Sequence, residues 1–206
     1  SIFMITGTIL INEQMEFIQS KDLGFDRENI MSISLPTDSN VNKQIPSWVE
    51  EVRNDPRVES VSLSSMPTGN SGLLMFRIEQ DSLLEQQSSR VLFVDEHFSN
   101  VLGLTFLSGR NFDRNINTDQ TQAFLINETA AKQFGWGDDA IGKRVQWGLQ
   151  PNNQATNDGK VVGVIKDFHF MSLHSPLETI IVLFNPNGSN TMSIRFTKGD
   201  YTGTME

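Results

Sequence analysis

Hydrophobic and polar residues change their spacing along this chain, and each change of spacing predicts a new element. Residues 30–35 and 58–64 alternate apolar and polar side chains, as half-buried strands do. Between them, residues 45–52 place apolar side chains three and four positions apart, as in a helix, and Pro46 is tolerated in its first turn. The order strand, helix, strand predicts an α/β unit near the front of the chain.

The rest of the chain is typical of short strands with two short helices. One helix is predicted over residues 97–102, ending at Gly103, and another begins after Asn127 and ends at Gly135. Asparagine suits a helix start because its side chain accepts a hydrogen bond from an early amide, and glycine suits a helix end because it adopts left-handed backbone angles. Further strands are predicted at residues 74–79, 90–94, 144–147, 160–165, 180–184 and 192–196.

This order of elements predicts an α+β fold with two lobes. The first lobe is a split α/β layer built by both ends of the chain, residues 23–69 and 159–206. A glycine-containing loop at residues 66–72 leads into the second lobe, a β-rich insertion over residues 70–158. A chain of 206 residues can bury roughly 70% of its unfolded surface, so it needs no metal or disulfide to fold.

The first residues of the chain, 2–11, are almost continuously apolar, and the pattern becomes periodic after Asn12. Such a short run cannot cross a bilayer, which takes roughly 20 residues. Two interpretations stand: an amphipathic helix packed on its own domain, or the last turns of a transmembrane helix that runs out into solvent. The continuous apolar start favours the second, so residues 1–22 are predicted to continue a transmembrane segment, and residues 202–206 to begin another helix.

Charge and cysteine content exclude several classes of function. The chain carries 16 basic and 25 acidic residues, a formal net charge of −9, so it lacks the basic surface that binds nucleic acid. The same balance disfavours an anionic membrane surface as the main partner. The absence of cysteine excludes a disulfide framework, a thiolate zinc site and a cysteine nucleophile.

A glycine-rich stretch, residues 137–143, fits the spacing of a phosphate-binding loop. Such a loop requires Ser or Thr next, to hold magnesium, and it must lie between a strand and a helix. Arg144 stands in that place, a predicted helix precedes the stretch, and two aspartates would repel a phosphate. The favoured interpretation is a glycine turn that leads into a strand.

The three histidines, His97, His169 and His174, do not form a convincing metal site. His169 and His174 are five residues apart, so they point to different faces of a helix or a strand, and Asp167 has no further ligand at a suitable spacing. Residues 167–170 are better explained as the end of a strand whose aromatic side chains enter the core.

No other pattern predicts catalysis. The chain contains no G-x-S-x-G motif, and its paired carboxylates lie in polar, solvated settings. We therefore expect no catalytic residue, no cofactor and no metal ligand, and the substrate-binding residues are unknown. The phenylalanines are expected mostly in the core, although some could line a groove for an apolar or peptide ligand: Phe76, Phe93, Phe98, Phe106, Phe112 and Phe124.

Several stretches form a specific pattern when their order and spacing are taken together: residues 14–18, 21–26, 109–112, 125–131, 140–145 and 161–173. In this pattern the chain resembles the MacB-like periplasmic core domain of FtsX-family ABC transporter permeases. The resemblance covers nearly the whole chain, and the matching residues are fold markers rather than catalytic groups: Gly24, Gly109, Asn127, Gly142, Gly163 and Asp167. Of these, Asn127 is expected to cap a helix and Asp167 to bond nearby amides.

The resemblance implies a porter-like α/β lobe with an inserted, sabre-like β-rich lobe, facing the periplasm from the inner membrane of a Gram-negative bacterium. It also implies that the domain couples ATP-driven movement of membrane helices to the handling of a periplasmic substrate or partner. The implied partners are a separate cytoplasmic ATPase subunit or domain, and a second permease copy or a periplasmic protein. The alternative is a free-standing periplasmic module that binds a ligand or a peptide.

Overall fold

The computed structural model describes residues 2–20, 24–26, 29–36, 38, 43–66, 73–81, 83–151, 154–169 and 176–197. Its elements, in chain order, are α1 (Ile2–Ser20), β1 (Ile30–Ser34), α3 (Ile45–Arg53), β2 (Val58–Ser64), β3 (Leu73–Gln80), β4 (Leu83–Val94), α4 (Phe98–Leu102), β5 (Phe106–Gly109), α5 (Asp119–Gln122), β6 (Ala123–Asn127), α6 (Glu128–Gln133), η1 (Gly137–Asp139), β7 (Arg144–Leu149), β8 (Ala155–Ile165), β9 (Ile180–Phe184), η2 (Pro186–Gly188) and β10 (Thr191–Phe196).

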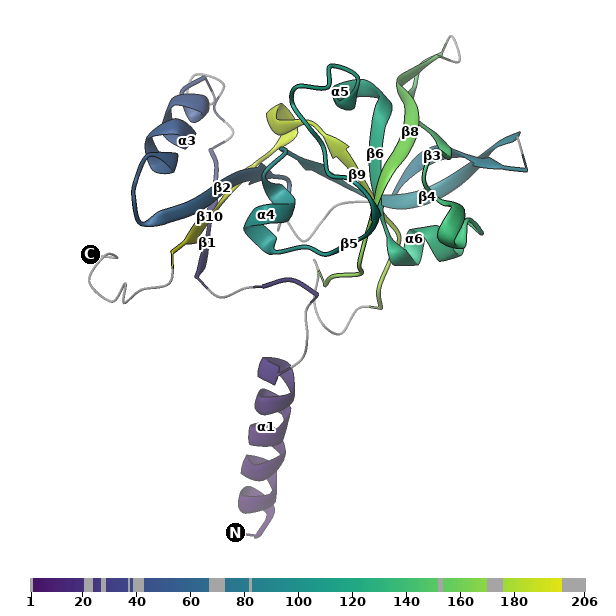
Figure 1. Cartoon of the computed structure of the whole chain (residues 1–206). Coiled ribbons are helices and arrows are strands. Elements are labelled where there is room, and N and C mark those ends of the chain that lie inside the picture. The colour runs from purple at the N-terminus through teal and green to yellow at the C-terminus, as the bar shows by residue number, and fades with distance from the viewer. Residues whose placement is uncertain are drawn as a thin grey trace.

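Three of these strands form a small sheet at one side of the molecule (Figure 1). β10 lies between β1 and β2 and runs antiparallel to both, so β1 and β2 are parallel to each other and α3 connects them. The apolar face of α3, Ile45 and Val49, packs with Val61 of β2 and Ile194 of β10 in one buried cluster. The predicted strand–helix–strand unit is confirmed, and the last strand of the chain completes its sheet.

Six other strands close into a ring. β4 pairs with β3 and β9, β3 with β7, β7 with β8, β8 with β6, and β6 with β9. β5 adds to β8 outside the ring, and the ring meets the small sheet where Ser64 of β2 pairs with Val94 of β4. Side chains that alternate inward fill the ring, among them Ile78, Phe124 and Ile181, each fully buried.

The two ends of the ring differ. Ala130 and Ala131 of α6 belong to the same buried cluster as the ring interior, together with Phe134 and Trp136, so α6 covers one end. α5 precedes β6 and lies at the opposite end (Figure 1). A second buried cluster lies outside the ring, where Phe98 and Leu102 of α4 contact the ring's outer face.

The helices and strands predicted within the described residues are confirmed, with one exception: β8 ends at Ile165, so residues 167–169 are not the end of a strand. Two strands are longer than expected. β4 begins at Leu83 rather than residue 90, and β8 at Ala155 rather than residue 160. The added parts carry mostly polar side chains, and they are held by pairing with β3 and β7 rather than by an apolar face. β5 and α5 were not predicted, because four residues are too short to show a period.

The mixed α+β class is confirmed, whereas the division into lobes stays a prediction. Residues 159–165 and β9 were expected in the lobe built by the chain ends, yet both pair with strands of the ring. Several expectations fall outside the described residues, namely those on the loop at 67–72, on His174 and on residues 202–206.

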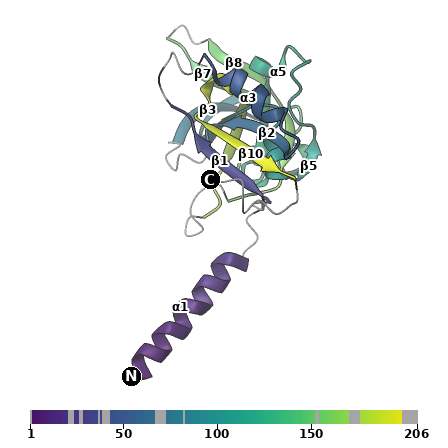
Figure 2. The ribbon, with the colours of Figure 1, turned by 90° about the vertical axis from the view of Figure 1, so that its left-hand side faces the viewer.

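The helix α1 projects away from the rest of the domain in both views (Figures 1 and 2). Its apolar side chains Met4, Ile5 and Ile11 are 80%, 61% and 63% exposed. Among the helices that the structure describes, none is long and apolar enough to cross a membrane. The packing of these side chains on their own domain, one of the two expectations, is not observed, and a continuing transmembrane helix stays a prediction.

Candidate functional site: a polar junction behind the first helix

The short segment that follows α1, residues 24–26, contacts two separate parts of the domain. The Asp26 amide donates a hydrogen bond to the Leu102 carbonyl at the end of α4, at 3.0 Å. Gly24 has a φ of +76°, and a Cβ added there would lie 2.2 Å from the carbonyl oxygen of Asp167. Only glycine allows both the backbone angle and the contact, so the chain passes very close to the residues that follow β8.

Arg195 of β10 connects this segment to the small sheet. Arg195 is buried, with 9% of its surface exposed. The guanidinium donates to the Val101 carbonyl at 2.8 Å, to the Asp26 carboxylate at 2.7 Å and to the Asp26 carbonyl at 3.2 Å. Arginine suits this place because its rigid fork of donors can bind two acceptors in different directions. One side chain therefore holds β10, α4 and residues 24–26 together.

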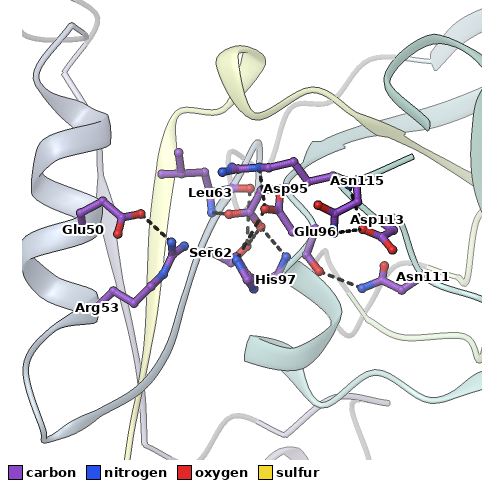
Figure 3. A network of polar contacts seen from close by, with 11 residues as sticks. Glu50, Arg53, Ser62, Leu63, Asp95, Glu96, His97, Asn111, Asp113 and Asn115 are labelled. Atoms are coloured by element: carbon purple, nitrogen blue, oxygen red, sulfur yellow. Dashed lines mark hydrogen bonds and ion pairs between the residues drawn. The ribbon is translucent and has the colours of Figure 1, made fainter. Parts of the chain in front are cut away.

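Asp95, between β4 and α4, is the second centre of the junction (Figure 3). Its carboxylate accepts hydrogen bonds from the Ser62 hydroxyl at 2.6 Å, the Leu63 amide at 2.8 Å and the His97 amide at 3.1 Å. Burial raises the pKa of Asp95, and the bonds from Ser62 and Leu63 offset this only in part. Because Ser62 and Leu63 belong to β2, Asp95 fixes the small sheet against the start of α4.

Glu96 and Asn111 extend this network toward the loop before α5 (Figure 3). The Glu96 carboxylate lies 2.9 Å from Nε of Arg114 and 3.6 Å from Nε2 of His97, and Asn111 donates to the Glu96 carbonyl at 2.8 Å. These contacts tie the loop after β5 to the residues just before α4. His97 is thus part of a polar surface network.

The same loop is closed by an ion pair whose carboxylate is buried, since the Asp119 side chain is 2% exposed and that of Arg110 is 44% exposed. Arg110 donates to both carboxylate oxygens of Asp119, at 2.6 and 2.8 Å. Burial of Asp119 would raise its pKa, but the bonds from Arg110 and from the Asp113 amide hold that pKa below its ordinary value. The pair stays charged and fixes the loop between β5 and α5.

Asp167 links the residues after β8 to α6. Its carboxylate accepts from the Asn127 side-chain amide at 2.7 Å, and from the amide and hydroxyl of Thr129 at 2.9 and 2.7 Å. The Asn127 oxygen in turn accepts from the Ala130 amide at 3.1 Å and from the Ile180 amide at 2.9 Å. The predictions that Asn127 caps a helix and that Asp167 bonds nearby amides are both confirmed.

An ion pair stands at the same end of the ring as this network. Arg90 of β4 donates to both carboxylate oxygens of Glu178, at 2.5 and 3.2 Å. The Arg90 guanidinium holds the pKa of Glu178 below its ordinary value. Glu178 also accepts from Asn127 through its backbone carbonyl, at 2.9 Å, so the pair is connected to the cap of α6.

Most other candidate residues have structural roles. Gly142, with a φ of +87°, forms the turn before β7, which confirms the glycine-turn interpretation of residues 137–143. The predicted core phenylalanines are buried at positions 76, 98, 112 and 124 and half-buried at positions 93 and 106. Gly109 and Gly163 lie where β5 and β8 approach closely, since an added Cβ would meet a carbonyl oxygen at 2.2 and 2.3 Å. His169 is half-buried.

Within the described residues, no three side chains of metal-binding type come together. The charged residues of the junction, Asp26, Asp95 and Arg195, were not predicted from the sequence. One feature of the sequence could have indicated Arg195: it is the single charged residue of the strand over 191–196. Its partner Asp26 lies 169 positions away, so no local spacing indicates the pair.

Comparison with known proteins gives a consistent result. A family profile described as the MacB-like periplasmic core domain matches residues 1–204. The periplasmic region of MacB from Actinobacillus actinomycetemcomitans has a TM-score of 0.59 at 14% identity, over 88% of this chain and 80% of that chain. No curated protein sequence matches the chain.

Two further solved structures share the fold. The extracellular domain of the noncanonic ABC-type transporter YknZ from Gram-positive bacteria has a TM-score of 0.55 at 15% identity, over 85% of this chain and 88% of that chain. A domain of a protein named as a permease, from Porphyromonas gingivalis, has a TM-score of 0.51 at 17% identity, over 73% of this chain and 67% of that chain.

Proposed function

The chain belongs to the family of MacB-like periplasmic core domains, which are parts of ABC transporter permeases, and from this premise we propose that it transmits movement. In this proposal, ATP-driven displacement of membrane helices reaches the domain through α1 and is passed to a periplasmic substrate or partner. A cytoplasmic ATPase, as a separate subunit or domain, supplies the movement. The parent protein lies in the inner membrane of a Gram-negative bacterium.

The observation that carries the proposal is the attachment of residues 24–26 to both sheets. The Asp26 carboxylate and carbonyl bind Arg195, and through it the small sheet. Gly24 packs against the backbone of Asp167, whose carboxylate holds α6 and hence one end of the ring. A displacement of this segment would therefore reach both sheets through short, direct contacts.

The test uses the whole permease, reconstituted with its ATPase in lipid nanodiscs. These 206 residues contain no cysteine, so once any cysteine elsewhere in the complex is replaced, a single Ser47→Cys substitution on the exposed side of α3 accepts a fluorescent donor, while a headgroup dye marks the bilayer. The proposal predicts that ATP changes energy transfer between donor and bilayer. Arg195→Met should remove that change while ATP hydrolysis continues.

Arg53→Met is the matched control, since Arg53 pairs with Glu50 on the surface of α3, with side-chain exposures of 31% and 63%. It should leave the ATP-dependent change intact. If the unmodified permease shows no change with ATP, or if Arg195→Met behaves like the control, the domain does not transmit movement through this junction.

A further inference from the structure

The end of the ring opposite α6 carries a pocket of about 280 Å³. Phe93 of β4, Trp147 of β7 and Leu183 of β9 lie at its base, where they join the buried core of the ring. Gln120 of α5 and Asn187 of η2 are exposed and lie at its rim. Mouths of strand barrels are common binding sites for small molecules, whose pockets start at roughly 300 Å³.

The base of the pocket offers a fixed aromatic surface. Trp147 stacks on Phe76 at a centroid distance of 6.5 Å and 29°, and it meets Phe93 at 5.6 Å and 59°. These contacts hold the indole ring in place. Among the residues that the structure describes, none accepts a hydrogen bond from the Trp147 indole N–H. That donor is available to a ligand.

Among the described residues that line the pocket, none has a charged side chain, although 20% of the chain's residues are charged. Its polar groups are side-chain amides and hydroxyls, including those of Gln120, Asn157 and Asn187. Each amide offers donors and an acceptor side by side, which is the pattern that neighbouring hydroxyl groups of a ligand can satisfy. An ionic ligand would lose its hydration here without gaining a counter-charge.

We propose that this pocket binds an uncharged saccharide of one or two sugar rings. The apolar face of a sugar ring fits on Trp147. The sugar hydroxyls meet the amide of Asn187 and that of Asn157, which also donates to the Gln120 carbonyl at 3.3 Å. A purely apolar ligand would cover these amides and satisfy none of their remaining donors and acceptors. A peptide that adds as a strand needs a free edge, yet β4, β7, β8 and β9 are each paired on both sides.

The test is a nuclear magnetic resonance titration of the full 206-residue chain, labelled with ¹⁵N, against cellobiose and N,N′-diacetylchitobiose. The chain has three tryptophans, so three indole N–H signals are expected. Trp136 donates its indole N–H to the Glu79 carbonyl at 2.7 Å and Trp48 lies on α3, so both serve as internal references. Trp147→Phe assigns the third signal.

The proposal predicts a saturable shift of the Trp147 signal by at least one disaccharide, with a Kd on the order of 1 mM or tighter, and constant reference signals. Asn187→Ala, at an exposed position that leaves the fold intact, should weaken binding about threefold to tenfold, the loss of one neutral hydrogen bond. If neither disaccharide shifts the Trp147 signal, the proposal is overturned. The proposal is also wrong if Asn187→Ala binds the disaccharide as tightly as wild type, or if a neutral dipeptide shifts the Trp147 signal and the sugars do not.

Discussion

Replacing Arg195 with methionine tests the junction at the side chain that makes most of its contacts. Methionine keeps the length and apolar character of the stem but removes all the donors, so packing within β10 is largely preserved. The Val101 carbonyl, which accepts from Arg195 at 2.8 Å, then loses its side-chain donor in a buried place. The Asp26 carboxylate and carbonyl lose their contacts as well.

The expected loss follows from these three acceptors. A buried acceptor without a partner costs about 1–3 kcal/mol, which applies to Val101. The side chain of Asp26 is 50% exposed, so solvent screening reduces its ion pair with Arg195 to about 0.5–1 kcal/mol. We therefore expect Arg195→Met to lower the free energy of unfolding by about 2–4 kcal/mol.

Urea denaturation of the 206-residue chain measures this loss, with Arg53→Met as the control. The surface pair of Arg53 with Glu50 should contribute no more than about 0.5 kcal/mol. Arg195→Lys should fall between wild type and Arg195→Met, because lysine keeps the charge but cannot bind two acceptors in different directions. A loss below about 1 kcal/mol for Arg195→Met, equal to that of the control, would refute the reasoning.

Three further substitutions probe the same region by equilibrium unfolding. Phe168→Ala should cost about 3–5 kcal/mol, because Phe168 is 1% exposed; a loss under about 1 kcal/mol would contradict its place in the core. Gly24→Ala should lower the free energy of unfolding more than Gly135→Ala does. Both glycines have a positive φ, but of the two only Gly24 has no room for a Cβ, which would clash with the Asp167 carbonyl. Equal losses of stability would disprove this close contact. Burial raises the pKa of Asp95 above its ordinary 3.8, so the folded state holds this proton more tightly than the unfolded state does. The difference in free energy of unfolding between wild type and Asp95→Asn should therefore fall as pH rises from 3.8 through the raised pKa. A difference that stays constant or increases with pH would refute this.

The local elements could be predicted because they depend on neighbours in the sequence. The period of apolar residues indicated β1, α3 and β2, and Asn127 with Gly103 marked helix ends. The closure of the ring could not be predicted in this way. It depends on the parallel pairing of β4 with β9, in which Arg90 lies opposite Ile180.

The candidate site was less accessible from sequence for the same reason. Asp167 and Asn127 are 40 positions apart, and each gave a local signal, so their roles were predicted separately but not their contact. Arg195 and Asp26 gave no joint signal across 169 positions. The saccharide pocket draws its lining from α5, four strands and η2, so only the folded ring brings these residues together.

The most direct test of transmitted movement is the distance between α1 and the domain in the working permease. Thr8 and Ser47 are both exposed. These 206 residues contain no cysteine, so with any cysteine elsewhere in the complex replaced, Thr8→Cys with Ser47→Cys places one spin label on α1 and one on α3. Pulsed electron resonance then gives the distance distribution with and without ATP. The account predicts one narrow distribution that ATP leaves unchanged, because helix and domain move together. A broad distribution, or one that shifts with ATP, would show that the chain bends between them, and it would contradict transmission through this junction.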